Sequence, residues 1–437
     1  MTPFQHFADD YRNKKVLILG LGTQGRGVGS AQVFCEIGAQ VRITDSKTAE
    51  QLSSSIEELA NYKVAYSLGQ HLKEDILWAD VIIRNASVPW NHELLLLARE
   101  KNIPIKMDAV LFFEYADISK TIGITGTRGK STTTTLIYEI LTANNCSTHL
   151  AGNITPTASL RLLQKFDPKA WYVFELSSWQ LQAFHESKIS PHIAVLTNLY
   201  PDHLLDRTYQ EYIQDKMAIY MYQEKTDFLV ANKDNSDLVK VLNSLKRSIN
   251  WFSASDGASY ETQLQGIHNL ENIAAAVAVA KLLKLSNIAS PIKHFTGLSY
   301  RLEPVGRIHG AKIINDTTST TPIAATKALE AYPGSILILG GTSKKLPVQS
   351  LAQAINSGAK KVVLIKGSGT DELKPYLDKE KVVGEFDSLK ESLKVAVSLI
   401  ENADDVILFS PAFTSFGMFK NEFDRGNQFN QLIKDYE

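Results

Sequence analysis

Four residues near position 130 have the types and spacing needed to hold a phosphate group. Gly126 and Gly129 precede the pair Lys130-Ser131 in TIGITGTRGKSTTTTLI. In such a loop the backbone N–H groups cradle phosphates, the lysine reaches the outer phosphates and the hydroxyl meets Mg²⁺. The common phosphate loop has another glycine five residues before the second one, but Ile124 stands there. The residues indicate nucleoside triphosphate binding, with a Thr-rich helix cap as the alternative.

A second glycine loop, GLGTQG at 20–25, follows an apolar run and precedes a helical pattern, and Asp45 ends the next apolar run. This is the dinucleotide fingerprint, which favours an NAD(P)-dependent dehydrogenase. The motif is compatible with a wider range of ligands, because a glycine-rich turn at a helix N-terminus accepts any nucleotide diphosphate. A tight turn without a ligand is the other alternative.

Polar residues of the middle third could complete a triphosphate site. Glu175 closes the run YVFE and could hold Mg²⁺ opposite Ser131, although a Glu at a strand end is more often solvated. His203 and Lys216 are, taken singly, a structural histidine and a surface lysine. Asn269 and Asn272 carry amide groups that could read an adenine edge or cap the helix that begins there.

The elements that must position these residues alternate along the chain. Short apolar runs separated by helix-period segments predict βαβ units and parallel sheets, hence an α/β fold. Ligands gather at the carboxyl ends of such strands, and each run ends in Gly, Asp, Asn or Ser. The runs lie at 15–22, 41–45, 79–85, 103–108, 121–126, 172–178, 193–198, 227–234, 311–316, 335–341, 360–367 and 404–411, with a long helix at 269–285.

Length and composition set the remaining limits. A chain of 437 residues predicts three domains at about 150 residues each, with seams near 106–108 and 296–306. The net charge of -1 favours no nucleic-acid partner. The N-terminus is polar and no apolar run approaches the ~20 residues needed to cross a membrane. The cysteines are Cys35 and Cys146, too few for a disulfide framework. We therefore predict a cytoplasmic protein without a membrane partner.

Several motifs together resemble the Mur ligase family, whose ATP loop lacks the early glycine. They follow the family's order along nearly the whole chain: ITGTRGKSTTT, AGNIT, ELSSWQL, LTNLYPDH, Lys216, GIHNLEN, YRLE, IIND, LGGTSKK and FSPAFTSFGMFKN-x-x-x-RG. The combination ELSS-x-Q-L, GG-x-x-K and SP-x-x-[AT]-S-F is similar to the D-glutamate-adding type.

The resemblance implies an ATP-dependent ligase of peptidoglycan precursor synthesis. Such an enzyme transfers the γ-phosphoryl of ATP to the carboxylate of UDP-N-acetylmuramoyl-L-alanine, and the amine of D-glutamate attacks the acyl phosphate. It also implies a monomer with a Rossmann-like UDP-substrate domain at 1–107, a central P-loop ATPase-type domain with a parallel sheet at 108–298, and a Rossmann-like amino-acid-binding domain at 299–437.

Site residues carried over from the family fall into four groups. ATP is assigned to Gly126, Thr127, Arg128, Gly129, Lys130, Ser131, Thr132, Asn272, Arg301 and Asp316. Two Mg²⁺ sites are assigned to Ser131 with Glu175 and to His203 with a carbamylated Lys216, and the catalytic set is Lys130, Glu175, His203 and Lys216. The UDP substrate is assigned to Gly22, Thr23, Gln24, Asp45, Ser46, Asn153, Ser177, Gln180 and His203. The amino acid is assigned to Thr320, Lys344, Ser415, Phe416 and Phe423.

Some positions depart from the family. Arg128 stands where Asn is frequent, and Thr155 where Gly is usual. Thr318 replaces an expected lysine, and Glu422-Phe423 reverses an aromatic–acidic order. We expect Glu422 to face solvent or an arginine and Phe423 to form the aromatic wall.

Other functions remain open at this stage. L-glutamate or another Mur ligase substrate is the alternative within the family. A dehydrogenase would leave the GKST loop unexplained, and a non-catalytic nucleotide-binding regulator is the third class.

Overall fold

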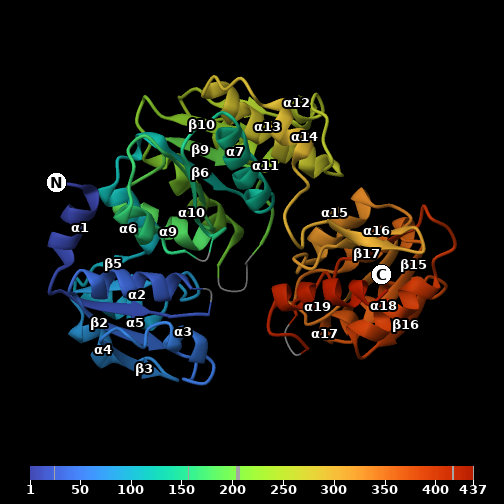
Figure 1. Ribbon diagram of the computed structural model, residues 1–437, viewed down its shortest axis with the longest axis horizontal. Coiled ribbons are helices and arrows are strands. Elements are labelled where there is room, and N and C mark those ends of the chain that lie inside the picture. Colours follow the sequence, from blue (N-terminus) through green and yellow to red (C-terminus); the bar gives the residue numbers. More distant parts are fainter. Residues whose placement is uncertain (24, 156, 203–206, 416–417, 437) are drawn as a thin grey trace. The chain divides into compact units, whose positions relative to one another are not determined.

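The computed structural model describes residues 1–23, 25–155, 157–202, 207–415 and 418–436 (Figure 1). Gln24, His203 and Phe416, which the sequence assigns to sites, lie outside the described residues. The chain forms two compact units: Met1–Tyr260 with Glu271–Ile292, and Glu261–Leu270 with Lys293–Glu437. Each unit is considered by itself.

The first unit holds two parallel sheets, of which the first has the strand order β3-β2-β1-β4-β5. Its strands are β1 (Lys15–Leu19), β2 (Gln40–Asp45), β3 (Val64–Leu68), β4 (Val81–Arg84) and β5 (Ile105–Lys106). The accompanying helices are α1 (Pro3–Tyr11), α2 (Arg26–Glu36), α3 (Ser53–Glu57), α4 (Lys73–Trp78) and α5 (Glu93–Glu100).

The second parallel sheet has the order β11-β10-β9-β6-β8-β7. Its strands are β6 (Thr121–Thr125), β7 (Thr148–Gly152), β8 (Trp171–Glu175), β9 (Ile193–Leu196), β10 (Phe228–Asn232) and β11 (Asn250–Phe252). The helices of this region are α6 (Asp108–Tyr115), α7 (Lys130–Ala143), α8 (Ser159–Gln164), α9 (Ser178–Ser187), α10 (Tyr209–Met221), α11 (Ser236–Leu242), α12 (Ala254–Gly257), α13 (Ile267–Leu282) and α14 (Ala289–His294), with a 3₁₀ turn at Ile118–Lys120.

The third sheet belongs to the second unit and has the order β12-β13-β17-β14-β15-β16. Its strands are β12 (Glu303–Ile308), β13 (Ala311–Asn315), β14 (Ile336–Gly340), β15 (Lys361–Ile365), β16 (Val382–Phe386) and β17 (Val406–Phe409). Only the β12–β13 pair is antiparallel among the described pairs. The helices are α15 (Pro322–Ala331), α16 (Gln349–Gly358), α17 (Ser368–Leu373), α18 (Leu389–Ser398) and α19 (Glu422–Lys434), with a 3₁₀ turn at Lys374–Tyr376.

The predicted α/β fold with parallel sheets is confirmed, and the long predicted helix is α13. The sequence prediction was incomplete for five strands, β3, β7, β11, β12 and β16, which lie at sheet edges. Edge strands are covered less than central ones, so their sequences lack the continuous apolar run that marks a buried parallel strand.

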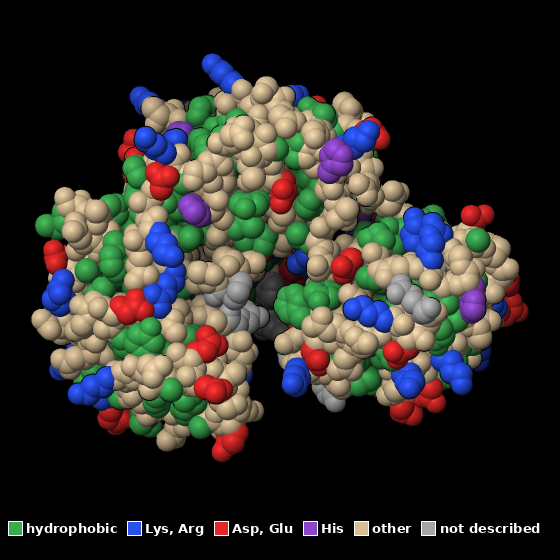
Figure 2. All heavy atoms as spheres, viewed as in Figure 1, with side chains coloured by type: hydrophobic (Ala, Val, Ile, Leu, Met, Phe, Trp, Pro, Cys, Tyr) green, Lys and Arg blue, Asp and Glu red, His purple; other side chains and the backbone are tan. Residues whose placement is uncertain are grey.

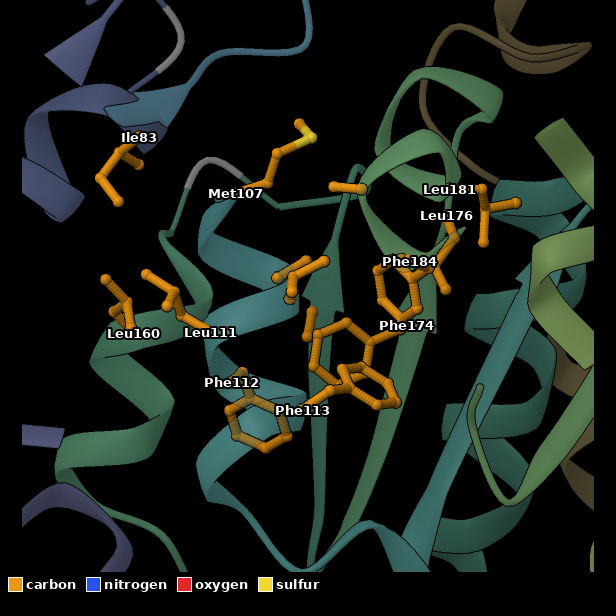
Figure 3. Packing of buried hydrophobic residues seen from close by; sticks show 14 of the residues in the cluster. Ile83, Met107, Leu111, Phe112, Phe113, Leu160, Phe174, Leu176, Leu181 and Phe184 are labelled. Carbon is orange, nitrogen blue, oxygen red and sulfur yellow. The ribbon is translucent and has the colours of Figure 1, made fainter. Parts of the chain in front are cut away.

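One hydrophobic cluster spans the first two sheets. It runs from Phe7 and Phe34 in the first region to the rings of the second. Figure 3 shows Phe112 and Phe113 of α6 beside Phe174 of β8, with ring centroids 5.1 Å and 4.8 Å from that of Phe174. The third sheet instead has clusters of its own on its two faces. The apolar residues on one face of the first sheet are therefore buried together with those of the second sheet, those on its other face form a cluster within the first region, and those of the third sheet are buried separately.

The visible surface is mixed in charge. Figure 2 shows basic and acidic side chains interspersed over the face in view. Within the described part of the chain, no helix is both long and apolar enough to cross a membrane.

Candidate functional site

The phosphate loop connects β6 to α7 at the carboxyl end of the second sheet. Gly126 has φ +155°, and a Cβ added there would lie 1.9 Å from Thr197 Oγ1. Gly129 has φ +79° and is the N-cap of α7. Both positions exclude other residues on steric grounds. The loop therefore presents the N-terminus of α7, which favours anions.

Two lysines converge on this loop. Lys130 Nζ donates to the carbonyl oxygens of Gly126 and Thr127, each at 3.0 Å. Lys216 Nζ, from α10, donates to the same Gly126 oxygen at 2.9 Å. Ser131 and Thr132 lie half-buried in the first turn of α7. The loop thus gathers two amines and a helix N-terminus at the end of one strand.

Lys216 is buried, with 1% of its side chain exposed. Burial lowers the pKa of Lys216 well below its usual value, and the charge of Lys130 lowers it further. Its amine also lies 4.6 Å from the ring centroid of Tyr212. The surface-lysine alternative is thereby wrong, and the buried position favours an uncharged amine.

The rest of the loop is held by its neighbours. Thr127 Oγ1 accepts from Tyr212 Oη at 3.0 Å and from the Tyr200 N–H at 2.9 Å. The backbone N–H of Arg128 donates to Asn198 Oδ1 at 2.8 Å, and its guanidinium lies 3.7 Å from Asp202. Thr127 and Arg128 thus have positions that their side chains help to define.

Glu175 lies at the end of β8, paired in register with Ile124 of β6. It is 2% exposed. Its Oε1 accepts from Asn153 Nδ2 at 2.9 Å, whereas Oε2 has no hydrogen-bond partner among the residues that the structure describes. A buried carboxylate oxygen needs a cation or a donor, and carboxylate oxygen suits Mg²⁺. The donor set therefore fits a divalent cation, although the described residues contain no group of three His, Cys, Asp or Glu side chains for one.

The two asparagines of α13 differ in role. Asn272 lies against the phosphate loop: its Oδ1 would be 2.1 Å from a Cβ on Gly129 and accepts from Thr133 Oγ1 at 3.4 Å. Asn269, in the other unit, donates to the Gln265 carbonyl at 2.8 Å. Asn272 therefore helps to form the loop, whereas Asn269 makes a local bond near the start of its helix.

The first glycine loop lies between β1 and α2. Asp45 Oδ2 accepts from the Gly22 N–H at 3.0 Å, and Oδ1 accepts from the Lys47 N–H at 2.9 Å. Asp45 is buried, while Thr23 and Ser46 are exposed. The carboxylate thus shapes the loop, and the exposed hydroxyls border it.

Residues assigned to the muramoyl part come from the second sheet. Ser177 and Gln180 form a capping box at the start of α9, each side chain bonding to the other's backbone N–H. Gln180 also lines a pocket with Gly20, Arg26, Asn85 and others, to which both sheets contribute. The structure therefore brings Gln180 to the first glycine loop.

Buried arginines in this region were missed from the sequence. Arg84 of β4 is 2% exposed and donates to the Trp179 carbonyl at 3.0 Å. Arg207 forms an ion pair with Asp215 beside Lys216 and stacks on Trp179. Their partners are carbonyls, rings and a carboxylate contributed by other elements, so no local motif could have indicated these contacts.

In the second unit, Asp316 lies at the end of β13. Its oxygens accept from the Leu302 N–H at 3.1 Å and from the hydroxyls of Ser319 at 2.5 Å and Ser410 at 2.7 Å. Burial raises the pKa of Asp316 to about 6, and these hydrogen bonds oppose the rise. Arg301, the residue before Leu302 in the chain, is exposed. Asp316 thus orders the turn that carries Arg301.

Two of the residues assigned to the amino acid, Thr320 and Lys344, are in contact in this unit. Lys344 Nζ donates to Thr320 Oγ1 at 3.1 Å, and Ser415 is buried. Phe423, 46% exposed, lies 6.1 Å from Tyr300 between ring centroids.

The buried Arg425 ties these segments together. It donates to the carbonyls of Phe413 at 3.1 Å and Thr317 at 2.8 Å. Burial lowers the pKa of Arg425 to about 10, and the charge of Glu422 opposes this lowering. That Glu422 faces an arginine stays a prediction, with Arg425 as the expected partner.

These features define an α/β nucleotide-binding protein with a cation-rich phosphate loop. The Mur ligase middle domain model matches residues 124–262. UDP-N-acetylmuramoylalanine–D-glutamate ligases are similar along almost the whole chain: that of Roseiflexus sp. (strain RS-1) is 33% identical, covering 97% of this chain and 99% of its own length. That of Borreliella afzelii (strain PKo) is 32% identical, covering 97% and 98%.

Solved structures share the fold. The UDP-N-acetylmuramate–alanine ligase of Thermotoga maritima has a TM-score of 0.61 at 17% identity, covering 97% of this chain and 100% of its own. The MurF ligase of the same organism, in complex with ADP, has a TM-score of 0.59 at 18% identity, covering 98% and 97%. The chain belongs to the Mur ligase family, whose members are ATP-dependent amide-bond-forming ligases. The dehydrogenase and non-catalytic interpretations therefore fall away.

Proposed function

We propose that this enzyme adds D-glutamate to UDP-N-acetylmuramoyl-L-alanine, releasing ADP and phosphate. The observation that carries the proposal is the match along 97% of the chain to relatives named for that reaction. We assign residues 1–107 to binding of the UDP part, residues 108–298 to binding of ATP and residues 299–437 to binding of the amino acid.

Activation of the carboxylate is assigned to the phosphate loop. The substrate carboxylate attacks the γ-phosphorus of ATP, ADP leaves, and an acyl phosphate forms. Lys130 and the N-terminus of α7 would stabilise the charge on the transferred phosphoryl group. The amine of D-glutamate then attacks the acyl carbon, loses a proton and displaces phosphate.

Mg²⁺, held by Ser131 with Glu175 and by His203 with Lys216, would neutralise phosphate charge. The bare Oε2 of Glu175 supports the first assignment. For the second, an uncharged Lys216 amine adds to CO₂ and releases a proton, giving an anionic carbamate that can serve as an oxygen ligand. The lowered pKa of Lys216 supports this step, because only the neutral amine is nucleophilic.

The experiment is phosphate release from ATP with UDP-N-acetylmuramoyl-L-alanine and a panel of amino acids. D-glutamate should give the fastest turnover. Faster turnover with L-glutamate or a neutral amino acid would overturn the proposed substrate while leaving ligase chemistry intact.

The pocket for glutamate is tested by two adjacent residues. Phe423 is exposed and its ring lies near that of Tyr300, whereas we expect Glu422 to face Arg425. We expect Phe423→Ala to raise the KM for glutamate by about tenfold, the loss of about 1.4 kcal/mol of binding, and Glu422→Ala to raise it far less. An equal or larger effect of Glu422→Ala would contradict the aromatic-wall assignment.

A further inference from the structure

One face of α2 lies against the segment that follows Asn153. At the start of the helix, Arg26 Nη1 donates to the carbonyl oxygens of Asn153 at 3.3 Å and Thr155 at 3.2 Å. Three residues later, a Cβ added to Gly29 would lie 2.9 Å from that of Ala158. The helix that follows the first glycine loop is therefore in close contact with the loop after β7.

The far end of the same face has another arginine contact. Arg161 of α8 donates to Glu36 Oε2 at 2.6 Å and to Gln32 Oε1 at 2.8 Å. Positions 26, 29, 32 and 36 are three or four residues apart and so share a face of α2. Arg26 and Arg161 thus mark the two ends of one interface.

The loop held by Arg26 leads directly to the candidate metal ligand. Asn153 donates to Glu175 twice, from its backbone N–H to the carbonyl oxygen at 2.8 Å and from Nδ2 to Oε1 at 2.9 Å. The other carboxylate oxygen, Oε2, has no partner in the described part of the chain. A displacement of the Asn153 loop would therefore move the oxygen that is proposed to meet Mg²⁺.

We propose that Arg26 is a positioning residue that couples the two nucleotide sites. Binding of the nucleoside-diphosphate sugar substrate at the first glycine loop orders the start of α2, Arg26 fixes the Asn153 loop, and Asn153 orients Glu175 for Mg²⁺–ATP. This inference rests on the proposed function of the two loops. A guanidinium suits the role because its fork holds two carbonyls in a defined geometry.

The test measures coupling by calorimetry on the full-length chain. The Kd for binding of the Mg²⁺ complex of a non-hydrolysable ATP analogue to the protein is determined with and without saturating UDP-N-acetylmuramoyl-L-alanine. In the wild-type protein the substrate should tighten binding by about 5- to 150-fold, the usual range of coupling between sites. In Arg26→Ala the ratio of the Kd without substrate to the Kd with substrate should fall to within about twofold of one.

Arg161→Ala is the matched control, since it removes a contact from the same interface at the other end of α2. It should keep the wild-type ratio. The double variant Arg26→Ala/Asn153→Ala should couple no less than Arg26→Ala alone, because both residues act in one path. If Arg26→Ala does not fold, Arg26→Gln is used with the same expected loss.

Three results would overturn the inference. They are a Kd that the substrate leaves unchanged in the wild-type protein, wild-type coupling in Arg26→Ala, or a loss of coupling in Arg161→Ala as large as that in Arg26→Ala. Phosphate release by the wild-type enzyme is measured in parallel. Turnover with unaltered coupling in Arg26→Ala refutes only the role of Arg26, whereas absent turnover with every amino acid refutes the proposed function.

Discussion

Lys216 contacts the phosphate loop from α10, and burial lowers the pKa of its amine well below the usual value. Lys216 and Lys130 donate to one carbonyl oxygen, that of Gly126. Their roles are nevertheless opposite in the proposed mechanism, because Lys130 must keep its charge and Lys216 must lose it to become a carbamate.

This difference predicts how the two variants respond to acetate. Lys216→Ala should lower phosphate release at least tenfold, and added acetate should restore part of the rate by supplying a carboxylate at the vacated position. Lys130→Ala should be equally impaired but insensitive to acetate, because a cation is missing there. Steady-state assays across an acetate series provide the measurement, and equal rescue of both variants would contradict the assignment.

Asp316 should give the stability of the protein a pH dependence of unusual sign. Its pKa of about 6 in the folded state exceeds the ordinary 3.8. Between these values the folded protein keeps a proton that the unfolded chain releases, so stability falls as pH rises from about 4 to about 6. A shift of two units corresponds to roughly 3 kcal/mol.

Urea unfolding of wild-type protein and Asp316→Asn at several pH values isolates this contribution. The variant should lack the fall between pH 4 and 6. Asp405→Asn is the control of opposite sign, because the hydrogen bond from Lys360 lowers the pKa of Asp405, so that its contribution is lost as pH falls. Parallel pH curves for wild-type and Asp316→Asn would show that Asp316 titrates normally.

At the level of single residues, the sequence indicates loop geometry where the residue type itself is restrictive. Gly126 and Gly129 have positive φ angles and close neighbours, so a glycine motif marks them. Arg26 and Arg425 were not recognised as site residues, because they bind carbonyls of segments distant in sequence. Such contacts arise only when the chain is folded.

At the scale of elements, α9 combines a structural and a proposed binding function in one side chain. Ser177 closes a capping box with Gln180 and is also assigned to the UDP substrate. Loss of an N-cap costs about 1 kcal/mol. Ser177→Ala should therefore lower the free energy of unfolding by about that amount and raise the KM for the UDP substrate.

Two further variants separate the functions. Ser177→Asp keeps a capping carboxylate and should retain stability, but its charge should still weaken binding of the anionic substrate. Thr2→Ala removes a capping box of the same kind, a hydroxyl residue with Gln5, from α1, and should reduce stability without changing KM. Recovery of KM in Ser177→Asp would indicate that the residue acts only as a cap.

Whether a strand could be predicted from the sequence depended on how deeply that strand is buried. Central strands such as β9, with all four residues of IAVL buried, appear as continuous apolar runs. The edge strand β3 has no buried residue in VAYSL, and β12 pairs antiparallel with a bulge near Pro304. Their existence depends on the neighbouring strand more than on their own sequence, as expected when propensity is context-dependent.

At the scale of the whole molecule, the distribution of core residues predicts which parts fold alone. The third sheet has only clusters of its own, whereas the first sheet has one cluster of its own and a second that it shares with the second sheet. A fragment of residues 293–437 should therefore unfold cooperatively, as an autonomous domain does. A fragment of residues 1–107 should expose apolar surface and bind a hydrophobic dye.

Circular dichroism melting curves and dye fluorescence of the two fragments provide the measurement. A non-cooperative transition for residues 293–437, or a cooperative dye-free fragment of residues 1–107, would contradict the expectation.

The separate core of the third sheet also bears on how such an enzyme can evolve. A gene segment encoding residues 293–437 could be exchanged between relatives by recombination without replacing any apolar residue of the shared cluster. Exchange of the segment for residues 1–107 would instead have to preserve the matched face of α2. Lineages should therefore diversify the added amino acid by recombination more readily than the nucleotide-linked acceptor.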